Sequence, residues 1–222
     1  MRLMGKVRLR RHQIVVAVFI TYIIIYLSFF SIIASNWTAD QIDQSLQEEH
    51  KTVMSFLRGA DEQIVPSMTI NEWEHLADVR KLFTIAMIIN VLAFGTLAGV
   101  WYFYNEQREE LIIGSFRIAG ISVLVICVVL GASIMLGFDQ FWVLFHKVVF
   151  PQGNWQFPYD SLLITMYPSS FFFWFIVQLS ARVCAMAAVL LAISYFMERM
   201  KLHEQAFENR KHKSARSRLR KK

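Results

Sequence analysis

The sequence predicts an all-α membrane protein in which four transmembrane helices carry a small extracytoplasmic head. Of the 222 residues, 55% are hydrophobic and 14% are aromatic, and the formal charge is +6, a combination that soluble basic domains rarely show. Four apolar runs alternate with polar segments, and each run is long enough to cross a bilayer. The predicted membrane helices cover about residues 14–34, 83–104, 118–138 and 170–197 of one integral membrane domain, residues 1–222.

The first apolar run, residues 14–34, carries no formal charge and follows a basic N-terminus. A helix of this length, rising about 1.5 Å per residue, covers a hydrocarbon core of about 30 Å. A cleaved signal peptide also begins with basic residues, but its apolar region is shorter, and a clear small-x-small cleavage site is absent here. We therefore expect the first helix to be retained as a membrane anchor.

The first polar segment, residues 36–81, is acidic, whereas both ends of the chain are basic. Its apolar residues recur at roughly helical spacing, which predicts a surface helix near the membrane that ends at Arg58-Gly59. A second short helix, residues 68–82, is expected to lead into the next membrane helix. Thr69 or Asn71 is the expected N-cap of that short helix.

The second polar segment, residues 139–169, contains Pro and Gly residues that fix turns, so we expect an ordered loop. Ordered loops on a rigid scaffold often carry functional sites. The N-terminus and the tail, residues 198–222, are both rich in Lys and Arg, which predicts cytoplasmic termini by the positive-inside rule. Residues 36–81 and 139–169 would then meet on the outer face and build the extracytoplasmic head.

The basic tail resembles a nucleic-acid-binding patch by composition alone. On a membrane protein, attraction to anionic lipid is the simpler interpretation, because each basic residue near the surface contributes about 1 kcal/mol. We therefore expect membrane lipids, and no nucleic acid, as partners of the tail.

Three histidines, His50, His75 and His146, lie in polar segments close to the ends of predicted helices. Histidine accepts and donates protons near neutral pH, and His75 and His146 are the candidates for acid–base chemistry. Asp78 follows His75 at i,i+3 and Glu72 precedes it at i−3, so a carboxylate on the same helical face could hold the imidazole in one tautomer. The alternative is a surface helix that carries an incidental histidine.

The loop after His146 contains Asp160 and three aromatic residues, Trp155, Phe157 and Tyr159. Aromatic side chains at this position are also typical of the belt at a membrane interface. The pairing of a histidine with a nearby carboxylate is less typical of such a belt, so we interpret His146 and Asp160 as candidate site residues.

Arg182 is a charged residue inside the fourth apolar run. An intramembrane arginine costs roughly 2.5–3.5 kcal/mol on insertion scales, and it normally faces a partner or a wet cavity. We expect Arg182 to bind an anion or to hold an acidic partner such as Asp160 or Asp139. Snorkelling toward the interface is the structural alternative.

These features recur in a known family. The matching residues are His75-x-x-Asp78-Val79, Phe145-His146, Gly153-x-Trp155-x-Phe157, Asp160-Ser161-Leu162 and Tyr167-Pro168. In them the chain resembles the lipoprotein intramolecular transacylases of Gram-positive bacteria, from the first helix through the fourth. The group that begins at Phe145 is the more specific part, because it is long and mixed in residue type. The sequence departs from the family at Leu76 and Arg80, where Met and Lys are expected, and at Glu49-His50, where Asn-Tyr is usual.

The resemblance implies an acyltransferase in the bacterial cell membrane that uses no cofactor. Its substrates would be diacylglyceryl-modified lipoproteins, and the acyl chain would move from the sn-2 ester to the α-amine of the N-terminal cysteine, giving a lyso-form lipoprotein. His146 would then act as general base and acid, and His75 would polarise the ester carbonyl or share the proton relay. Asp78 or Asp160 would orient an imidazole. The expected substrate-binding residues are Trp155, Arg182, Phe145 and Tyr159.

Two other function classes stay open. The residues His75, His146, Asp78 and Asp160 could bind a metal ion in a metal-dependent membrane hydrolase or transporter. Alternatively, the head could bind a partner in a non-catalytic assembly or sensor protein. The sequence contains no P-loop, HExxH, GxSxG or CxxC pattern, so ATPase, zincin, serine hydrolase and thiol-redox functions lack their usual support. Both cysteines lie inside apolar runs, which argues against a disulfide or a zinc cluster.

Overall fold

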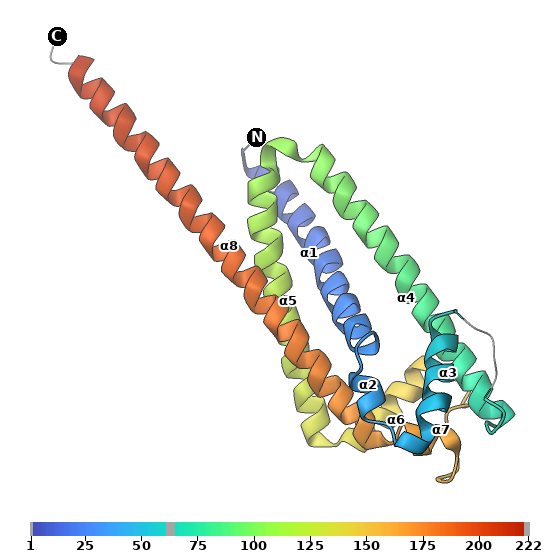
Figure 1. The fold of residues 1–222 in the computed structure, drawn as a ribbon. Coiled ribbons are helices and arrows are strands. Elements are labelled where there is room, and N and C mark those ends of the chain that lie inside the picture. Colours follow the sequence, from blue (N-terminus) through green and yellow to red (C-terminus); the bar gives the residue numbers. More distant parts are fainter. Residues whose placement is uncertain (1, 61–64, 220–222) are drawn as a thin grey trace.

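The computed structural model describes residues 2–60 and 65–219, and every regular element within these ranges is a helix (Figure 1). Four helices are long and apolar enough to cross a membrane. They are α1 (Arg2–Ile33), α4 (Ile70–Phe103), α5 (Arg108–Leu136) and α8 (Ser169–Leu219). The predicted all-α fold with four membrane helices is therefore confirmed.

The four long helices form a bundle in which α1 contacts α4, α5 and α8, and α5 also packs along α8. Small residues line the centre, where Ala17, Ala119 and Ala187 are almost fully buried. A Cβ atom on Gly120 would lie 2.7 Å from Cγ of Leu191, so α5 and α8 approach closely because this position lacks a side chain. Small residues have this role in membrane helix packing generally.

The short elements gather at one end of the bundle (Figure 1). We call this group, with its connecting loops, the cap. It consists of α2 (Trp37–Asp40), η1 (Gln44–Leu46), α3 (Gln47–Leu57), α6 (Phe138–Val149) and α7 (Leu162–Met166). Residues from both polar segments share one core, including Val53, Phe56, Leu163 and Met166. Both polar segments therefore build one head, as predicted.

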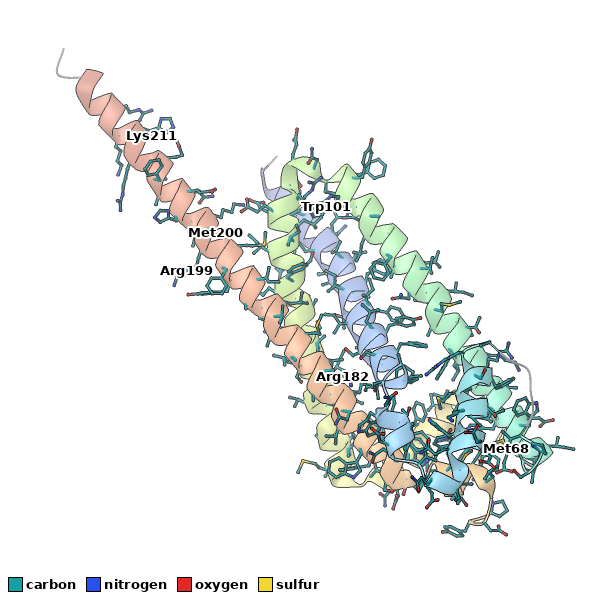
Figure 2. All side chains as sticks on the ribbon, viewed as in Figure 1. Met68, Trp101, Arg182, Arg199, Met200 and Lys211 are labelled. Carbon is teal, nitrogen blue, oxygen red and sulfur yellow. The ribbon has the colours of Figure 1, made fainter. Side chains whose placement is uncertain are left out.

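The N-terminus and the turn between α4 and α5, which contains η2 (Asn105–Gln107), lie at the end of the bundle opposite the cap (Figure 1). Figure 2 shows Trp101 near this turn and Met68 among the cap residues. From the cap, α8 runs back along the bundle and projects beyond it, so the C-terminal end of α8 also lies away from the cap (Figure 1). Both ends of the described chain therefore lie away from the cap, as expected when four helices cross the membrane.

Helix α4 is continuous. The short helix expected over residues 68–82 and the membrane helix expected over residues 83–104 are parts of this one helix. It begins after Thr69, whose hydroxyl accepts a hydrogen bond from the Glu72 backbone N–H at 3.3 Å while the Glu72 carboxylate accepts from the Thr69 backbone N–H at 2.8 Å. This capping box identifies Thr69 as the N-cap. No Pro or Gly lies between Thr69 and the membrane part of the helix, so nothing ends the helix there.

Helices α5 and α8 both extend past their predicted limits at the end opposite the cap. Helix α5 starts at Arg108, ahead of the expected start at 118, and α8 continues past 197. Arg117 pairs with Glu198, and Lys201 pairs with Glu110 at 2.7 Å. These two ion pairs join the charged extensions of α5 and α8.

Helix α6 is the main element that the sequence analysis missed, because residues 139–169 were expected to form a loop. Its twelve residues follow α5 after Gly137. In contrast, the expected surface helix corresponds to α3, which ends at Leu57, and Gly59 adopts a φ of +74°, the left-handed conformation that favours glycine after a helix. The turn at Arg58-Gly59 is thus confirmed.

Candidate functional site

The cap brings the two candidate histidines together. His75 lies in the second turn of α4 and His146 in the last turn of α6, and the centroids of their imidazole rings are 6.0 Å apart. His146 is buried, with 6% of its surface exposed, whereas His75 is half-buried. At this separation two positive charges would repel each other, so the pair favours states with at most one proton beyond neutrality.

One hydrogen bond fixes the tautomer of His146. Its Nδ1 atom lies 2.9 Å from the backbone carbonyl oxygen of Trp142. A carbonyl only accepts, so Nδ1 carries the proton in the neutral imidazole, and Nε2 keeps its lone pair. Burial lowers the pKa of His146, although the bond to the Trp142 carbonyl opposes that effect. His146 therefore presents an unprotonated Nε2 near neutral pH, as a general base requires.

Aromatic rings surround the two imidazoles. The ring centroid of His75 lies 4.6 Å from that of Phe150 and 5.6 Å from that of Phe157. His146 contacts four aromatic rings, with centroid distances of 4.3 Å to Trp142, 4.9 Å to Trp155, 5.3 Å to Phe145 and 5.7 Å to Phe150. These apolar walls reduce the access of water to the imidazoles, which strengthens electrostatic interactions inside the site.

Asp78 is linked to His75 through the side-chain amide of Asn154. Its Oδ2 accepts hydrogen bonds from Nδ2 of Asn154 at 2.8 Å and from Nε2 of Gln152 at 2.7 Å, and its Oδ1 accepts from Lys81 at 2.8 Å. The side chain of Asn154 lies beside the imidazole of His75. The Oδ1 atom of Asn154 and the Nδ1 atom of His75 are both buried, and neither has a hydrogen-bond partner among the residues that the structure describes.

Glu72 stabilises the fold of the cap. It was a candidate to orient His75, but its carboxylate binds Thr69 and the backbone of Leu163 instead. It is 1% exposed, and its Oε1 accepts from the backbone N–H of Leu163 at 2.9 Å while its Oε2 accepts from Thr69. The first N–H groups of a helix have no partner within that helix, so a carboxylate at the start of α7 satisfies them. Glu72 thereby ties α7 to α4 instead of facing the imidazole.

Three of the predicted site residues lie apart from the histidine pair. Asp160 is exposed and makes no hydrogen bond or ion pair with the residues that the structure describes, and Tyr159 is 98% exposed. Arg182 donates a hydrogen bond to the hydroxyl oxygen of Ser31 at 2.6 Å, which links α8 to the cap end of α1 (Figure 2). In the described residues Arg182 therefore has a hydroxyl partner, and neither Asp160 nor Asp139 is its acidic partner.

Two residues beside Asp78, Asn154 and Gln152, were not predicted from the sequence, and no role was predicted for His50. The Nδ1 atom of His50 lies 2.8 Å from the hydroxyl of Tyr167, which joins α3 to the end of α7. Burial and the charge of Arg58 lower the pKa of His50, and burial raises the pKa of Tyr167. Near neutral pH a neutral His50 and a neutral Tyr167 hydroxyl therefore share this hydrogen bond. This buried pair belongs to the core of the cap.

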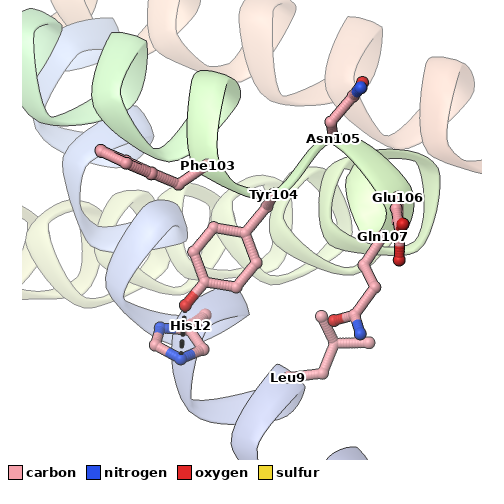
Figure 3. Close-up of a pocket in the computed structure, with 7 residues that line it drawn as sticks. All are labelled: Leu9, His12, Phe103, Tyr104, Asn105, Glu106 and Gln107. Atoms are coloured by element: carbon pink, nitrogen blue, oxygen red, sulfur yellow. Dashed lines mark hydrogen bonds between the residues drawn. The ribbon is translucent and has the colours of Figure 1, made fainter.

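A hollow of about 630 Å³ lies at the other end of the bundle (Figure 3). It lies between α1 and the α4–α5 turn, where the Tyr104 hydroxyl is 2.8 Å from Nε2 of His12. Its remaining lining residues are Leu9, Phe103, Asn105, Glu106 and Gln107. Because it is separated from the cap by the length of the bundle, we do not assign the chemistry to it.

The four residues that the metal-site alternative requires are not gathered in one place. Among the residues that the structure describes, no group of three or more His, Cys, Asp or Glu side chains is placed to hold a metal ion. Asp78 is engaged by two amides and a lysine, and Asp160 is exposed on the loop. The described residues therefore place two imidazoles, and no set of metal ligands, at this site.

Comparisons with known proteins agree with the fold. A family model described as lipoprotein intramolecular transacylase Lit matches residues 10–172. Three solved structures of the membrane-integral lipoprotein intramolecular transacylase Lit from Bacillus cereus resemble the chain. One has a TM-score of 0.75 at 17% identity and covers 88% of this chain and 98% of its own.

The other two solved structures are variants in which one histidine is replaced by arginine or by alanine. Their TM-scores are 0.70 and 0.71 at 16% identity, and each covers 91% of this chain. They cover 98% and 100% of their own chains. No curated protein matches the chain.

Proposed function

The chain belongs to the lipoprotein intramolecular transacylase family, and we propose that it transfers an acyl chain within one lipoprotein molecule. The acyl chain leaves the sn-2 ester of the diacylglyceryl group and is taken up by the α-amine of the N-terminal cysteine. The observation that carries this proposal is the pair of imidazoles, 6.0 Å apart, in an aromatic site at one end of a membrane bundle. One of the two, His146, keeps an unprotonated Nε2.

The reaction suits a site that positions one substrate and moves one proton. An α-amine has a pKa of about 7.7–8.0, so a useful fraction is already nucleophilic near neutral pH. The ester and the amine belong to the same molecule, so folding the lipid into a near-attack geometry removes most of the entropic cost. A C–N bond forms as the ester C–O bond breaks, and one proton passes from nitrogen to the departing glycerol oxygen.

His146 is the residue proposed to move that proton. Its Nε2 accepts the proton from the attacking amine and then donates it to the sn-2 oxygen of glycerol. His75 polarises the ester carbonyl or shares the proton relay from the other side of the site. Asp78 orients His75 through Asn154, because its carboxylate holds the amide group that lies beside that imidazole. Asp160 is too exposed to share this role in the arrangement described.

Substrate contacts follow from the walls of the site. Trp155 and Phe145 both contact the ring of His146, so they are proposed to hold the acyl chain and glycerol next to the base. Tyr159, an exposed residue of the loop after α6, is proposed to meet the headgroup region or the peptide. Arg182 is proposed to bind polar groups of the lipid with the guanidinium N–H groups that Ser31 leaves free.

The proposed orientation has both termini in the cytoplasm and the cap on the extracytoplasmic face of a bacterial cell membrane. The charge asymmetry supports it, because the N-terminus and the tail are rich in Lys and Arg while residues 36–81 are acidic. Lipoproteins anchored in the outer leaflet would then present the ester and amine at the depth of the cap. Their diacylglyceryl form is the proposed substrate, and the lyso form is the product.

Mass spectrometry of a lipoprotein N-terminal peptide tests this function. Peptides are compared from cells that express the wild type, His146→Ala, His75→Ala or the control His203→Ala, which changes an exposed histidine of the tail. Wild type and control are expected to produce an isobaric N-acyl lyso-peptide with distinct fragment ions, and the two site variants are expected to leave the diacylglyceryl peptide unchanged. An unchanged peptide in all four, with normal membrane insertion, would overturn the proposal.

A further inference from the structure

Helix α6 presents three different faces along its twelve residues. The first face packs against the protein. Phe138, Trp142 and His146 follow one another at i,i+4 spacing, and the ring of Trp142 lies 4.3 Å from that of Phe172 on α8, while Phe138 lies 5.7 Å from Phe173. His146 on this face is buried. This face therefore anchors α6 to the bundle and holds the proposed base inward.

The second face of α6 is apolar and uncovered by the residues that the structure describes. Leu144 is 62% exposed and Val148, one turn later, is 72% exposed. Phe145 borders this face at 41% exposure. On a helix these residues fall on the side away from His146, because 100° per residue places Leu144 and Val148 roughly opposite it. An apolar surface of this kind requires a partner.

The third face is polar. Asp139, Gln140 and Lys147 share it, and all three are exposed. Together with Val143 and Leu144 they line a shallow hollow of about 410 Å³. Around the helix axis, the polar face lies between the buried face and the apolar face.

The apolar face continues a surface that meets lipid. Met135 and Leu136, which end α5 immediately before α6, are each 90% exposed, and they close a candidate membrane span that runs to Leu136. Only Gly137 separates that span from α6. A continuous apolar surface on both helices indicates acyl chains as the occupant, because a protein partner would have to displace lipid from the end of α5 as well.

We propose that α6 is an interfacial membrane helix, with Leu144 and Val148 among the acyl chains at the cap end of the bundle and Lys147 and Gln140 among the headgroups. Amphipathic helices of this type bury their apolar face about 5–10 Å into the boundary between headgroups and acyl chains. The helix thereby sets the depth of His146. That consequence rests on the proposed function, whereas the position of α6 does not, since depth is measurable without acyl transfer.

Spin labels at single positions test the depth of α6. Labels are placed at residues 144, 148, 140 and 147, one at a time, in the full chain with Cys127→Ser and Cys184→Ser, reconstituted in phosphatidylglycerol and phosphatidylethanolamine liposomes. We expect collisions with oxygen to exceed collisions with a water-soluble nickel chelate at 144 and 148, and the reverse at 140 and 147. Equal nickel access at all four positions would overturn the proposal.

A second measurement needs no substitution. Wild-type protein in the same liposomes is irradiated with a phospholipid that carries a diazirine on its acyl chain, and the adducts are mapped by mass spectrometry. Leu144 and Val148 are expected to react as strongly as Met135 and Leu136, while Tyr159, at 98% exposure in the loop, stays unmodified. Adducts on the α5 residues with none on α6 would show that a protein surface or water covers this face, and the proposal would fail.

Discussion

Asn154 directs its side-chain carbonyl away from Asp78, because its amide nitrogen donates to the Asp78 carboxylate at 2.8 Å. An ionised carboxylate only accepts hydrogen bonds, so chemistry fixes which end of the amide faces it. The carbonyl oxygen is then buried beside His75, whose Nδ1 is also buried without a partner among the described residues. A hydrogen bond between these two atoms would place the proton of the neutral His75 imidazole on Nδ1.

Replacing Asn154 tests whether this link positions His75. Asn154→Ala removes the amide that lies against both Asp78 and His75, whereas Gln152→Ala removes an exposed amide that donates to the same Oδ2 atom. Hydrogen bonds to charged groups contribute about 1.5–3 kcal/mol, so Asn154→Ala should slow turnover on the order of 10- to 100-fold. Gln152→Ala should change it little.

Steady-state kinetics on a diacylglyceryl lipopeptide measure the difference, with kcat and KM determined separately. A positioning role predicts that Asn154→Ala lowers kcat more than it raises KM. Equal losses in both variants would mean that the two amides only hold the loop, and the link to His75 would be wrong.

Glu72 is predicted to matter for stability. Glu72→Ala removes the acceptor of the backbone N–H of Leu163 and of two donors on Thr69, and each buried donor left unsatisfied costs about 1–3 kcal/mol. In a chain of this size 1 kcal/mol corresponds to about 2–4 °C, so the thermal midpoint in detergent should fall by roughly 5 °C or more.

Glu74→Ala is the matched control for that experiment, because Glu74 lies two residues further along α4 and is exposed. Its thermal midpoint should stay close to that of the wild type. A Glu72 variant as stable as the control would contradict the view that this carboxylate ties α7 to α4.

The sequence predicted the features that depend on local pattern. The four membrane helices follow from apolar length, Thr69 caps α4 because a hydroxyl there meets the free N–H groups, and Gly59 ends the turn after α3. The short helix expected over residues 68–82 continues into the membrane helix, and the two form the single helix α4. When no Pro or Gly lies between a surface helix and a membrane helix, the two continue as one helix, and the sequence marks no boundary between them.

The features that depend on tertiary contact were harder to predict. Both histidines were candidates, but their approach to 6.0 Å depends on how α6 packs on α8, and α6 itself was expected to be a loop. The Pro and Gly residues that follow α6 favoured a loop over the whole segment, although the apolar and polar residues of α6 are separated at helical spacing. Asn154 is uncharged and was not predicted as a site residue. A partly buried carboxylate such as that of Asp78 nevertheless requires hydrogen-bond donors.

The protonation of His146 gives a prediction on pH. Burial lowers the pKa of this imidazole below its ordinary value of about 6.5. The neutral base therefore predominates at pH 7, and it is lost as pH falls through the lowered pKa, below 6.5. The rate of acyl transfer should therefore fall over that same pH range as His146 becomes protonated. The α-amine of the substrate becomes protonated at higher pH, near its own pKa of about 7.7–8.0.

Nitrogen NMR on protein labelled with ¹⁵N-histidine measures both the tautomer and the titration of His146, with His146→Gln used to assign its signals. At pH 7 we expect a protonated Nδ1 and an unprotonated Nε2, because Nδ1 donates to the Trp142 carbonyl. A protonated Nε2 at pH 7 would rule out that nitrogen as the base. A transition at or above pH 6.5 would contradict the effect of burial.

The last prediction concerns the contact between α5 and α8. Gly120→Ala would place a Cβ atom 2.7 Å from Leu191 Cγ and 3.2 Å from the Ala187 carbonyl oxygen, so the helices must move apart, at a cost of about 1–3 kcal/mol. Gly131→Ala, on the same helix, meets no atom within 4 Å and removes a residue with poor helix propensity, so it should be neutral or stabilising by up to about 1 kcal/mol. Thermal unfolding of both variants in one detergent separates packing from propensity. Equal midpoints would show that the α5–α8 contact tolerates a methyl group, and the close approach at Gly120 would not be what holds these helices together.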